Sequence, residues 1–121
     1  MNKEETTNDN ICQKYGFEYP RCGVSIDKGW LPIVESLFQT LVLNGHKVKF
    51  DQIKQKFGRL TIYFHCPNNA EYEKVKTIVR EAEKITSRTC ESCGNKGKER
   101  SDRWIRIMCN ECNEIYLNRF K

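Results

Sequence analysis

The chain has 121 residues, of which 38% are hydrophobic and 31% charged, and its formal net charge is +5. This length allows one domain, or one domain with a small appendage, and no apolar run approaches the ~20 residues that a membrane-spanning helix needs. Residues 1–10 are polar and lack the apolar segment of a signal peptide, so we expect a disordered tail there and a location in a reducing cytosol.

The first predicted element is a helix over residues 30–42, where apolar side chains recur at three- and four-residue steps. Pro32 suits the first turn of this helix, and Asn44-Gly45 suits its end. The preceding residues 11–29 read as an irregular segment whose aromatic side chains attach it to a core.

Between residues 46 and 66 the apolar period changes to two, which is typical of strands. The pattern slips after Phe50 and continues with Ile53 and Phe57, and Gly58-Arg59 supplies a turn. The segment therefore predicts an antiparallel hairpin.

A second helix is predicted after the hairpin, starting at the capping pair Asn68 and Glu71, with an apolar stripe from Tyr72 to Ile85. Its polar face is rich in Glu and Lys and reads as a solvated surface. Only residues 87–89 separate this helix from Cys90, so we expect the C-terminal segment to pack directly on the helix end.

Two Cys-x-x-Cys pairs, separated by fifteen residues, lie near the C-terminus: Cys90, Cys93, Cys109 and Cys112. Zn²⁺ accepts four thiolates as a tetrahedron, and four cysteines close the shell that a catalytic zinc leaves open for water. A reducing compartment disfavours disulfides, and a redox Cys-x-x-Cys would begin a helix in a βαβ unit, which the pattern does not indicate. We therefore predict a structural Zn²⁺ site at these four residues.

The predicted fold class is α+β: a helix, an antiparallel β-hairpin and a helix, with a C-terminal zinc ribbon packed on them. Residues 11–88 form the core and residues 89–121 the ribbon module. Residues 104–108 read as a ribbon strand, and a third strand of the main sheet is expected from residues 115–120 or from the ribbon. Zinc binding, at about 10–16 kcal/mol for structural sites, would become folding energy of this module.

Three further cysteines, Cys12, Cys22 and Cys66, lack metal-ligand spacing and are interpreted as buried free thiols. These three cysteines and His65 could form a second metal site only if the N-terminal segment lies across the end of the hairpin. His46 is expected at the surface. No serine, histidine and acid fall in a catalytic order, so no catalytic residue is predicted. A third hypothesis for the function is a thiol-dependent enzyme that uses Cys12, Cys22 or Cys66.

Basic residues gather on the hairpin and on the ribbon. They are Lys47, Lys49, Lys54, Lys56 and Arg59, and then Lys96, Lys98, Arg100, Arg103 and Arg106. Beside an exposed aromatic such as Tyr63 they could hold a nucleic-acid backbone, or the strand lysines could prevent unwanted strand pairing. Four thiolates and one Zn²⁺ together contribute −2, which lowers the net charge from +5 to about +3 and weakens the nucleic-acid interpretation.

Three stretches, CGVSIDKGWLPIVESL (22–37), IKQKFGRLTIYF (53–64) and TCESCGNKG…WIRIMCNEC (89–112), resemble a group of small bacterial and phage proteins. Members typically show a Cys-Gly-x-Gly-Trp segment, a Lys-x-Lys-Phe-Gly-x-Leu hairpin and a C-terminal Cys-x-x-Cys metal knuckle. In this chain residues 24–28 interrupt the first motif. The resemblance implies a phage or mobile-element setting in a bacterial host cell, and it implies no activity.

From these observations we expect a non-enzymatic structural-zinc protein that acts by binding another macromolecule. The favoured partner is a protein, with this chain as an inhibitor, adaptor or counter-defence factor. The alternative is a nucleic-acid-binding zinc-ribbon protein that uses the basic hairpin and ribbon. No membrane association is expected.

Overall fold

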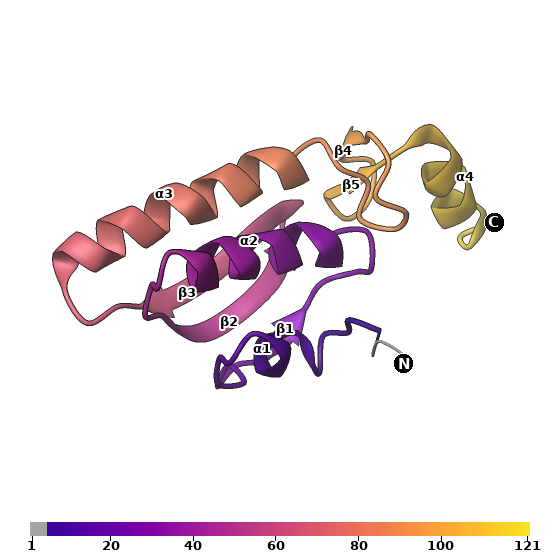
Figure 1. Cartoon of the computed structure of the whole chain (residues 1–121). Coiled ribbons are helices and arrows are strands. Elements are labelled where there is room, and N and C mark those ends of the chain that lie inside the picture. Colours follow the sequence, from indigo (N-terminus) through magenta and orange to yellow (C-terminus); the bar gives the residue numbers. More distant parts are fainter. Residues whose placement is uncertain (1–4) are drawn as a thin grey trace.

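The computed structural model describes residues 5–121 and has an α+β architecture. In chain order its elements are α1 (Ile11–Lys14), β1 (Val24–Ser25), α2 (Leu31–Leu43), β2 (Lys49–Lys56), β3 (Arg59–His65), α3 (Asn69–Thr86), β4 (Lys98–Arg100), β5 (Arg106–Met108) and α4 (Asn110–Asn118). The two long helices and the sheet β1–β2–β3 form the body of the molecule, and β4, β5 and α4 lie at one end of it (Figure 1). The predicted order of helix, hairpin, helix and C-terminal ribbon is confirmed.

The main sheet is built on the hairpin of β2 and β3, which pair antiparallel with Ile53 opposite Ile62. The register shifts between Phe50 and Gln52, where the sequence pattern slips. The turn lies at Phe57 and Gly58, with φ of 53° and 77°, one residue before the position that we predicted. Two residues with positive φ twist a short turn in the direction that the paired strands need.

The third strand of this sheet is β1, which pairs in parallel with the outer edge of β2 through Val24 and Ile53. Our prediction of a third strand from residues 115–120 or from the ribbon was wrong. Residues 115–118 belong to α4, and the ribbon strands form their own two-stranded sheet. A strand of two residues such as β1 carries no readable alternation, so its identity depends on the tertiary contact with β2.

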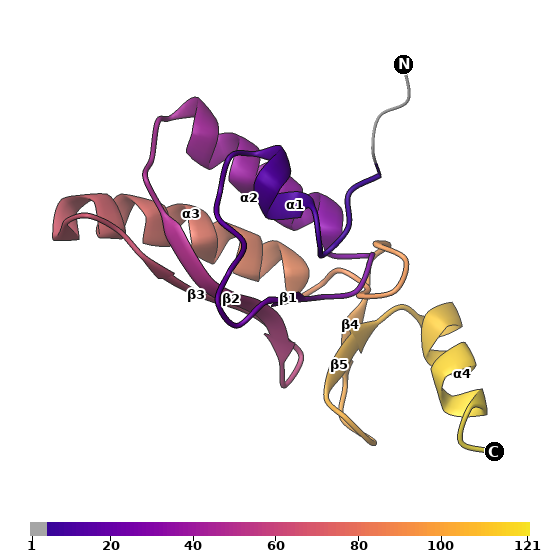
Figure 2. The same cartoon turned by 90° about the horizontal axis from the view of Figure 1, so that it is seen from below.

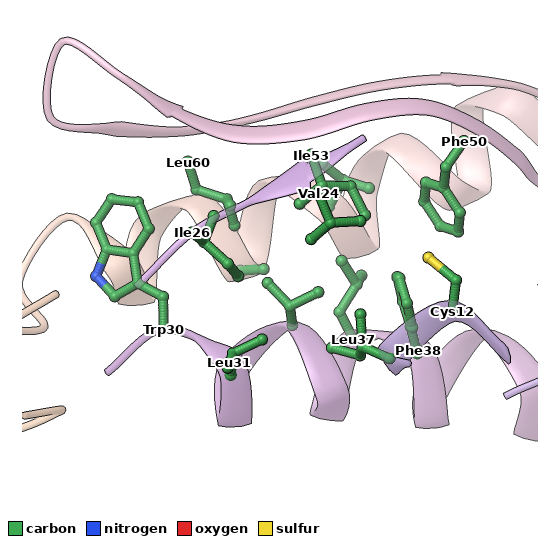
Figure 3. Close-up of a cluster of buried hydrophobic side chains, with 14 of the residues drawn as sticks. Cys12, Val24, Ile26, Trp30, Leu31, Leu37, Phe38, Phe50, Ile53 and Leu60 are labelled. Carbon is green, nitrogen blue, oxygen red and sulfur yellow. The ribbon is translucent and has the colours of Figure 1, made fainter. Parts of the chain in front are cut away.

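The hydrophobic core lies between one face of the sheet and the helices α2 and α3 (Figure 3). Phe38 of α2 stacks on Phe50 of β2 at a centroid distance of 4.9 Å, and Phe17 packs against both rings. Tyr72 of α3 stacks on Phe64 of β3, also at 4.9 Å. Because Phe50 and Phe64 are cross-strand partners, both helices cover the same face of the sheet.

The N-terminal segment differs from the expected tail of residues 1–10 in the part that the structure describes. Thr6 Oγ1 donates a hydrogen bond to Glu35 Oε2 at 2.9 Å, and Asn8 Nδ2 donates to the carbonyl of Ile26 at 2.9 Å. The short helix α1 follows, in a segment that we expected to be irregular. Residues 5–10 are therefore attached to the body of the fold.

Glu35 of α2 is the common partner of several of these residues, because Tyr15 Oη also donates a hydrogen bond to its carboxylate at 2.6 Å. That hydrogen bond, with further ones from Thr6 and Lys14, lowers the pKa of Glu35. A depressed folded-state pKa contributes stability above the unfolded value of about 4.5, and this stability disappears as the pH falls through the lower folded value.

Glu35→Gln is thus expected to reduce the free energy of unfolding at neutral pH by about 1–2 kcal/mol and to flatten its acid dependence. Urea unfolding at neutral and acid pH measures both effects. Glu73→Gln, an exposed position of α3, is the matched control and should leave both unchanged. An equal loss for the two variants would contradict the role of Glu35.

The start of α3 confirms half of the predicted capping pair. Asn68 Oδ1 accepts a hydrogen bond from the Glu71 backbone N–H at 2.8 Å. The Glu71 carboxylate does not return to Asn68 but contacts His46 Nδ1 at 2.9 Å and accepts from the Lys47 N–H at 3.1 Å. The expected surface position of His46 was therefore wrong, since its side chain is largely buried against Glu71.

Among the described residues, no helix combines the length and the apolar character required to cross a membrane.

Candidate metal centre

The four sulfur atoms of Cys90, Cys93, Cys109 and Cys112 lie within 4.8 Å of one another. The Sγ atoms of Cys93 and Cys109 are 3.7 Å apart. A tetrahedron with ligands at ~2.3 Å from its centre has edges of ~3.8 Å, so the spacing is close to that of four thiolates around one ion. The two pairs that the sequence predicted as one site are therefore together, and they could hold a metal ion.

The first pair forms a tight turn between β-bridged backbone segments. The Gly94 N–H donates to the Cys90 carbonyl at 2.9 Å, and the Asn95 N–H donates to Cys93 Sγ at 3.5 Å. Gly94 has φ of +85°, a conformation that a residue with a Cβ adopts at a cost. The two hydrogen bonds close the turn, and the sulfur atoms of Cys90 and Cys93 lie within 4.8 Å of each other.

The second pair lies at the start of a helix and not in a tight turn like that of the first pair. Cys109 follows β5 directly and is the N-cap of α4, where its Sγ accepts a hydrogen bond from the Cys112 N–H at 3.4 Å. The unpaired N–H groups at a helix N-terminus favour negative charge. The site therefore combines one turn, one hairpin and one helix start.

The close approach of the four thiols shifts their pKa values in opposite directions. Burial raises the pKa of Cys90, but N–H groups of Cys109, Cys93 and Ser92 outweigh burial and lower it to about 7. A hydrogen bond that the Cys112 thiol donates to the Cys109 sulfur raises the pKa of Cys112, and burial acts in the same direction. Four adjacent thiolates repel one another, so full deprotonation of this cluster requires a cation.

The site is joined to the core by direct contacts with the residues at the start of α2. The Gly29 N–H donates to the Glu91 carbonyl at 2.7 Å, and Trp30 Nε1 donates to the Thr89 carbonyl at 2.8 Å. A Cβ at Gly29 would lie 2.3 Å from the Cys90 carbonyl oxygen. The first turn of the site therefore packs backbone to backbone against the start of α2.

Glu91, between the first two cysteines, links the turn to both hairpins. Its Oε2 accepts a hydrogen bond from the Ile107 N–H at 2.7 Å and one from Gln55 Nε2 at 3.1 Å. Gln55 Nε2 also donates to the Ile105 carbonyl at 3.1 Å. Neither spacing nor a motif predicted these roles of Gly29, Gln55 and Glu91, because the roles arise only from this packing.

The other cysteines do not form a second group with His65, since the cluster above is the one group of metal-ligating side chains found in residues 5–121. Cys12 is buried, Cys66 is half-buried and Cys22 is exposed, so the interpretation of Cys22 as a buried thiol was wrong. Burial raises the pKa of Cys12 to about 11 and also raises that of Cys66, to which Glu71 contributes.

The basic residues of the hairpin share one surface. Ile53, Leu60 and Ile62 point into the core, so the alternate positions of the two strands point away from it. These outward positions include Lys49, Lys54, Lys56, Arg59, Thr61 and Tyr63. We call these six residues the outer sheet face. Lys47 precedes β2 and is exposed beside it.

The basic residues of the ribbon are divided. Lys96 and Lys98 are exposed. Arg100 donates to the Met108 carbonyl, and the Arg103 guanidinium lies 3.9 Å from the centre of the Phe120 ring. Arg106, which was predicted as a nucleic-acid contact, is 3% exposed and is a structural residue.

The surroundings of Arg106 explain its burial. Its Nη2 donates to Asp102 at 2.9 Å and to Asn113 at 2.6 Å, and its guanidinium lies 3.9 Å from the centre of the Tyr116 ring. This side chain therefore connects the β4–β5 hairpin to α4, and the prediction that it contacts nucleic acid is corrected.

Two large exposed aromatic side chains were not recognised as surface features. Phe57 was assigned to the apolar pattern of β2 but occupies the turn, and Trp104 was assigned to a strand that begins at Arg106. They are 69% and 79% exposed.

Comparisons of the chain with protein-family models, curated proteins and solved structures give no match.

Proposed function

We propose that Cys90, Cys93, Cys109 and Cys112 bind one structural zinc ion that completes the fold. The observation that carries this proposal is the sulfur cluster itself, which lies where the turn, the hairpin and the helix meet. Four thiolates suit Zn²⁺ and close its coordination shell, so the ion would hold the chain together and leave no position for a catalytic water.

The protein then acts by binding another macromolecule and not as an enzyme. The free thiols that are sheltered from solvent support this proposal, since the raised pKa of Cys12 and of Cys66 keeps both protonated near neutral pH. A protonated thiol is a poor nucleophile.

A protein partner, in a phage or mobile-element setting, is one candidate, with this chain as inhibitor, adaptor or counter-defence factor. Exposed apolar side chains, above all Leu43, Phe57 and Trp104, support it. Leu43 does not share a patch with Phe57, however, because Leu43 ends α2 and Phe57 lies at the opposite end of β2.

Nucleic acid is the second candidate, and the outer sheet face favours it. Residues 46–66 contain five basic residues and one acidic residue. The acidic residue, Asp51, pairs with His65. The cationic side chains therefore line an open surface with no unpaired acid of the same hairpin, which is the arrangement that a phosphate backbone requires.

A binding assay separates the two candidates. Gel shifts with DNA and RNA across a salt series should show binding at low salt that weakens steeply as salt rises, because phosphate contacts release counterions. A parallel pull-down from a bacterial host tests for a protein partner. If the pull-down recovers a protein and no oligonucleotide shifts at low salt, the partner is a protein and not nucleic acid.

A further inference from the structure

We propose that single-stranded nucleic acid binds at the tips of the two hairpins, with bases stacked on Phe57 and Trp104 and phosphates on the outer sheet face. This inference deepens the proposed nucleic-acid function and rests on it. It is based on a shared cleft, two exposed aromatic rings from different hairpins, and the charge of the strand beside them.

The two hairpin tips lie side by side at the same end of the molecule (Figure 2). The contact between them is tight, since a Cβ at Gly58 would lie 2.8 Å from Ile105 Cγ2. The hydrogen bond from Gln55 to the Ile105 carbonyl joins the same segments. The spacing of the tips is therefore fixed by packing, which reduces the entropy that a ligand would lose on binding between them.

A cleft of about 480 Å³ opens between the tips. Its lining includes Gln55, Lys56, Phe57, Trp104, Ile105 and Tyr116. Phe57 and Trp104 keep more than two thirds of their surface exposed, although each lines the cleft. Exposed rings of this size contribute little to the fold, whereas they offer flat faces on which any base can stack.

The charge next to the cleft suits a polyanion. Lys56 and Arg59 are cross-strand partners immediately behind the Phe57 turn, and Lys54 follows on the same face. Glu91 is the acid at the cleft, but it is buried and its Oε2 accepts two hydrogen bonds. Tyr63, 45% exposed, continues the outer sheet face away from the tips and offers a further stacking position.

Single strands fit this arrangement better than a duplex. Stacking on Phe57 and Trp104 requires unpaired bases whose faces are free, and a duplex offers such faces only at its ends. Binding is therefore expected to tolerate sequence and to discriminate against duplexes.

The test uses short mixed-sequence single-stranded DNA and RNA with the metal-loaded full chain. Trp30 is buried and Trp104 is exposed, so quenching of tryptophan fluorescence reports a base at the cleft. Affinity is measured by the anisotropy of a labelled oligonucleotide. Trp104→Ala is expected to weaken binding at least about 5-fold. Trp104→Phe keeps an aromatic ring and should retain most of the affinity. Phe57→Asn removes the other ring with a residue that tolerates positive φ.

The charge is tested separately. Lys54→Gln, Lys56→Gln and Arg59→Gln together should reduce the slope of log affinity against log salt by about 2, because each lost phosphate contact contributes about 0.7 for a single strand. Lys76→Gln with Lys84→Gln on α3 is the control away from the sheet and should leave the slope unchanged. Leu43→Ala, which removes a similarly exposed apolar side chain at the end of α2, controls for Trp104→Ala.

Three results would overturn the inference: no binding at low salt, equal affinity for duplex, or unchanged affinity in Trp104→Ala and Phe57→Asn. A protein partner that needs the same two aromatics, with no oligonucleotide binding, would also overturn it and leave the proposed zinc-dependent binding function standing. Loss of the metal or of the folded ribbon in the unmodified chain would instead contradict the proposed function.

Discussion

Removal of the metal is expected to unfold residues 89–121 and to leave the sheet β1–β3 with α2 and α3 folded. The C-terminal module buries few apolar side chains, and Ile107 is its one member of the core cluster among the described residues. A structural zinc site supplies about 10–16 kcal/mol of binding free energy, which becomes folding free energy of the module. We expect the remaining contacts of the module to stabilise it by less than this amount. Hydrogen exchange of the chelated protein should show lost protection after residue 89 and retained protection in the sheet.

Two exposed cysteines provide a matched pair for this expectation. Cys93 belongs to the sulfur cluster, whereas Cys22 does not, and both are exposed. Cys93→Ser should lose stoichiometric metal and destabilise the module, and Cys22→Ser should do neither. If the two variants behave alike, or if chelation leaves the protection of the module unchanged, the cluster does not hold the module together.

Gly29→Ala is expected to destabilise the protein by about 3 kcal/mol, the upper part of the range for overpacked sites. The added Cβ would lie 2.3 Å from the Cys90 carbonyl oxygen and 2.4 Å from that of Glu91. Both are backbone atoms of the first metal-binding turn and cannot rotate away as a side chain would. The variant should therefore weaken metal binding as well as stability, measured by competition with a chelator and by urea unfolding.

Gly45→Ala is the control for the glycine change itself. Gly45 has φ of +66°, and nothing lies within 4 Å of the added Cβ, so this variant introduces backbone strain without a clash. It should cost about 1 kcal/mol and leave metal affinity unchanged. Equal effects of the two variants would show that the contact between Gly29 and the metal-binding turn contributes nothing specific.

The sequence predicted the elements that have a strong period. The helix from Leu31, the hairpin with its slip after Phe50, and the helix capped by Asn68 all follow from spacing of apolar residues and from capping chemistry. The four cysteines were found in the same way, because two ligands at a spacing of three residues can reach one ion from a single turn.

Features that depend on contacts between distant segments were not predictable in this way. The strand β1 exists because it pairs with β2, and Arg106 is buried because Asp102, Asn113 and Tyr116 surround it. Charge alone placed Arg106 with the surface residues. Phe57 similarly fits an apolar pattern, and only the turn geometry makes it a surface side chain.

The central claim is that one zinc ion binds the four clustered thiols and gives the C-terminal module its shape. Metal analysis of the purified chain, combined with the absorption spectrum after Co²⁺ exchange, tests it most directly. We predict one zinc per chain and the spectrum of a tetrahedral site with four thiolate ligands, lost in Cys93→Ser and kept in Cys22→Ser. A folded chain without stoichiometric metal, or a Co²⁺ spectrum without thiolate ligands, would contradict the claim.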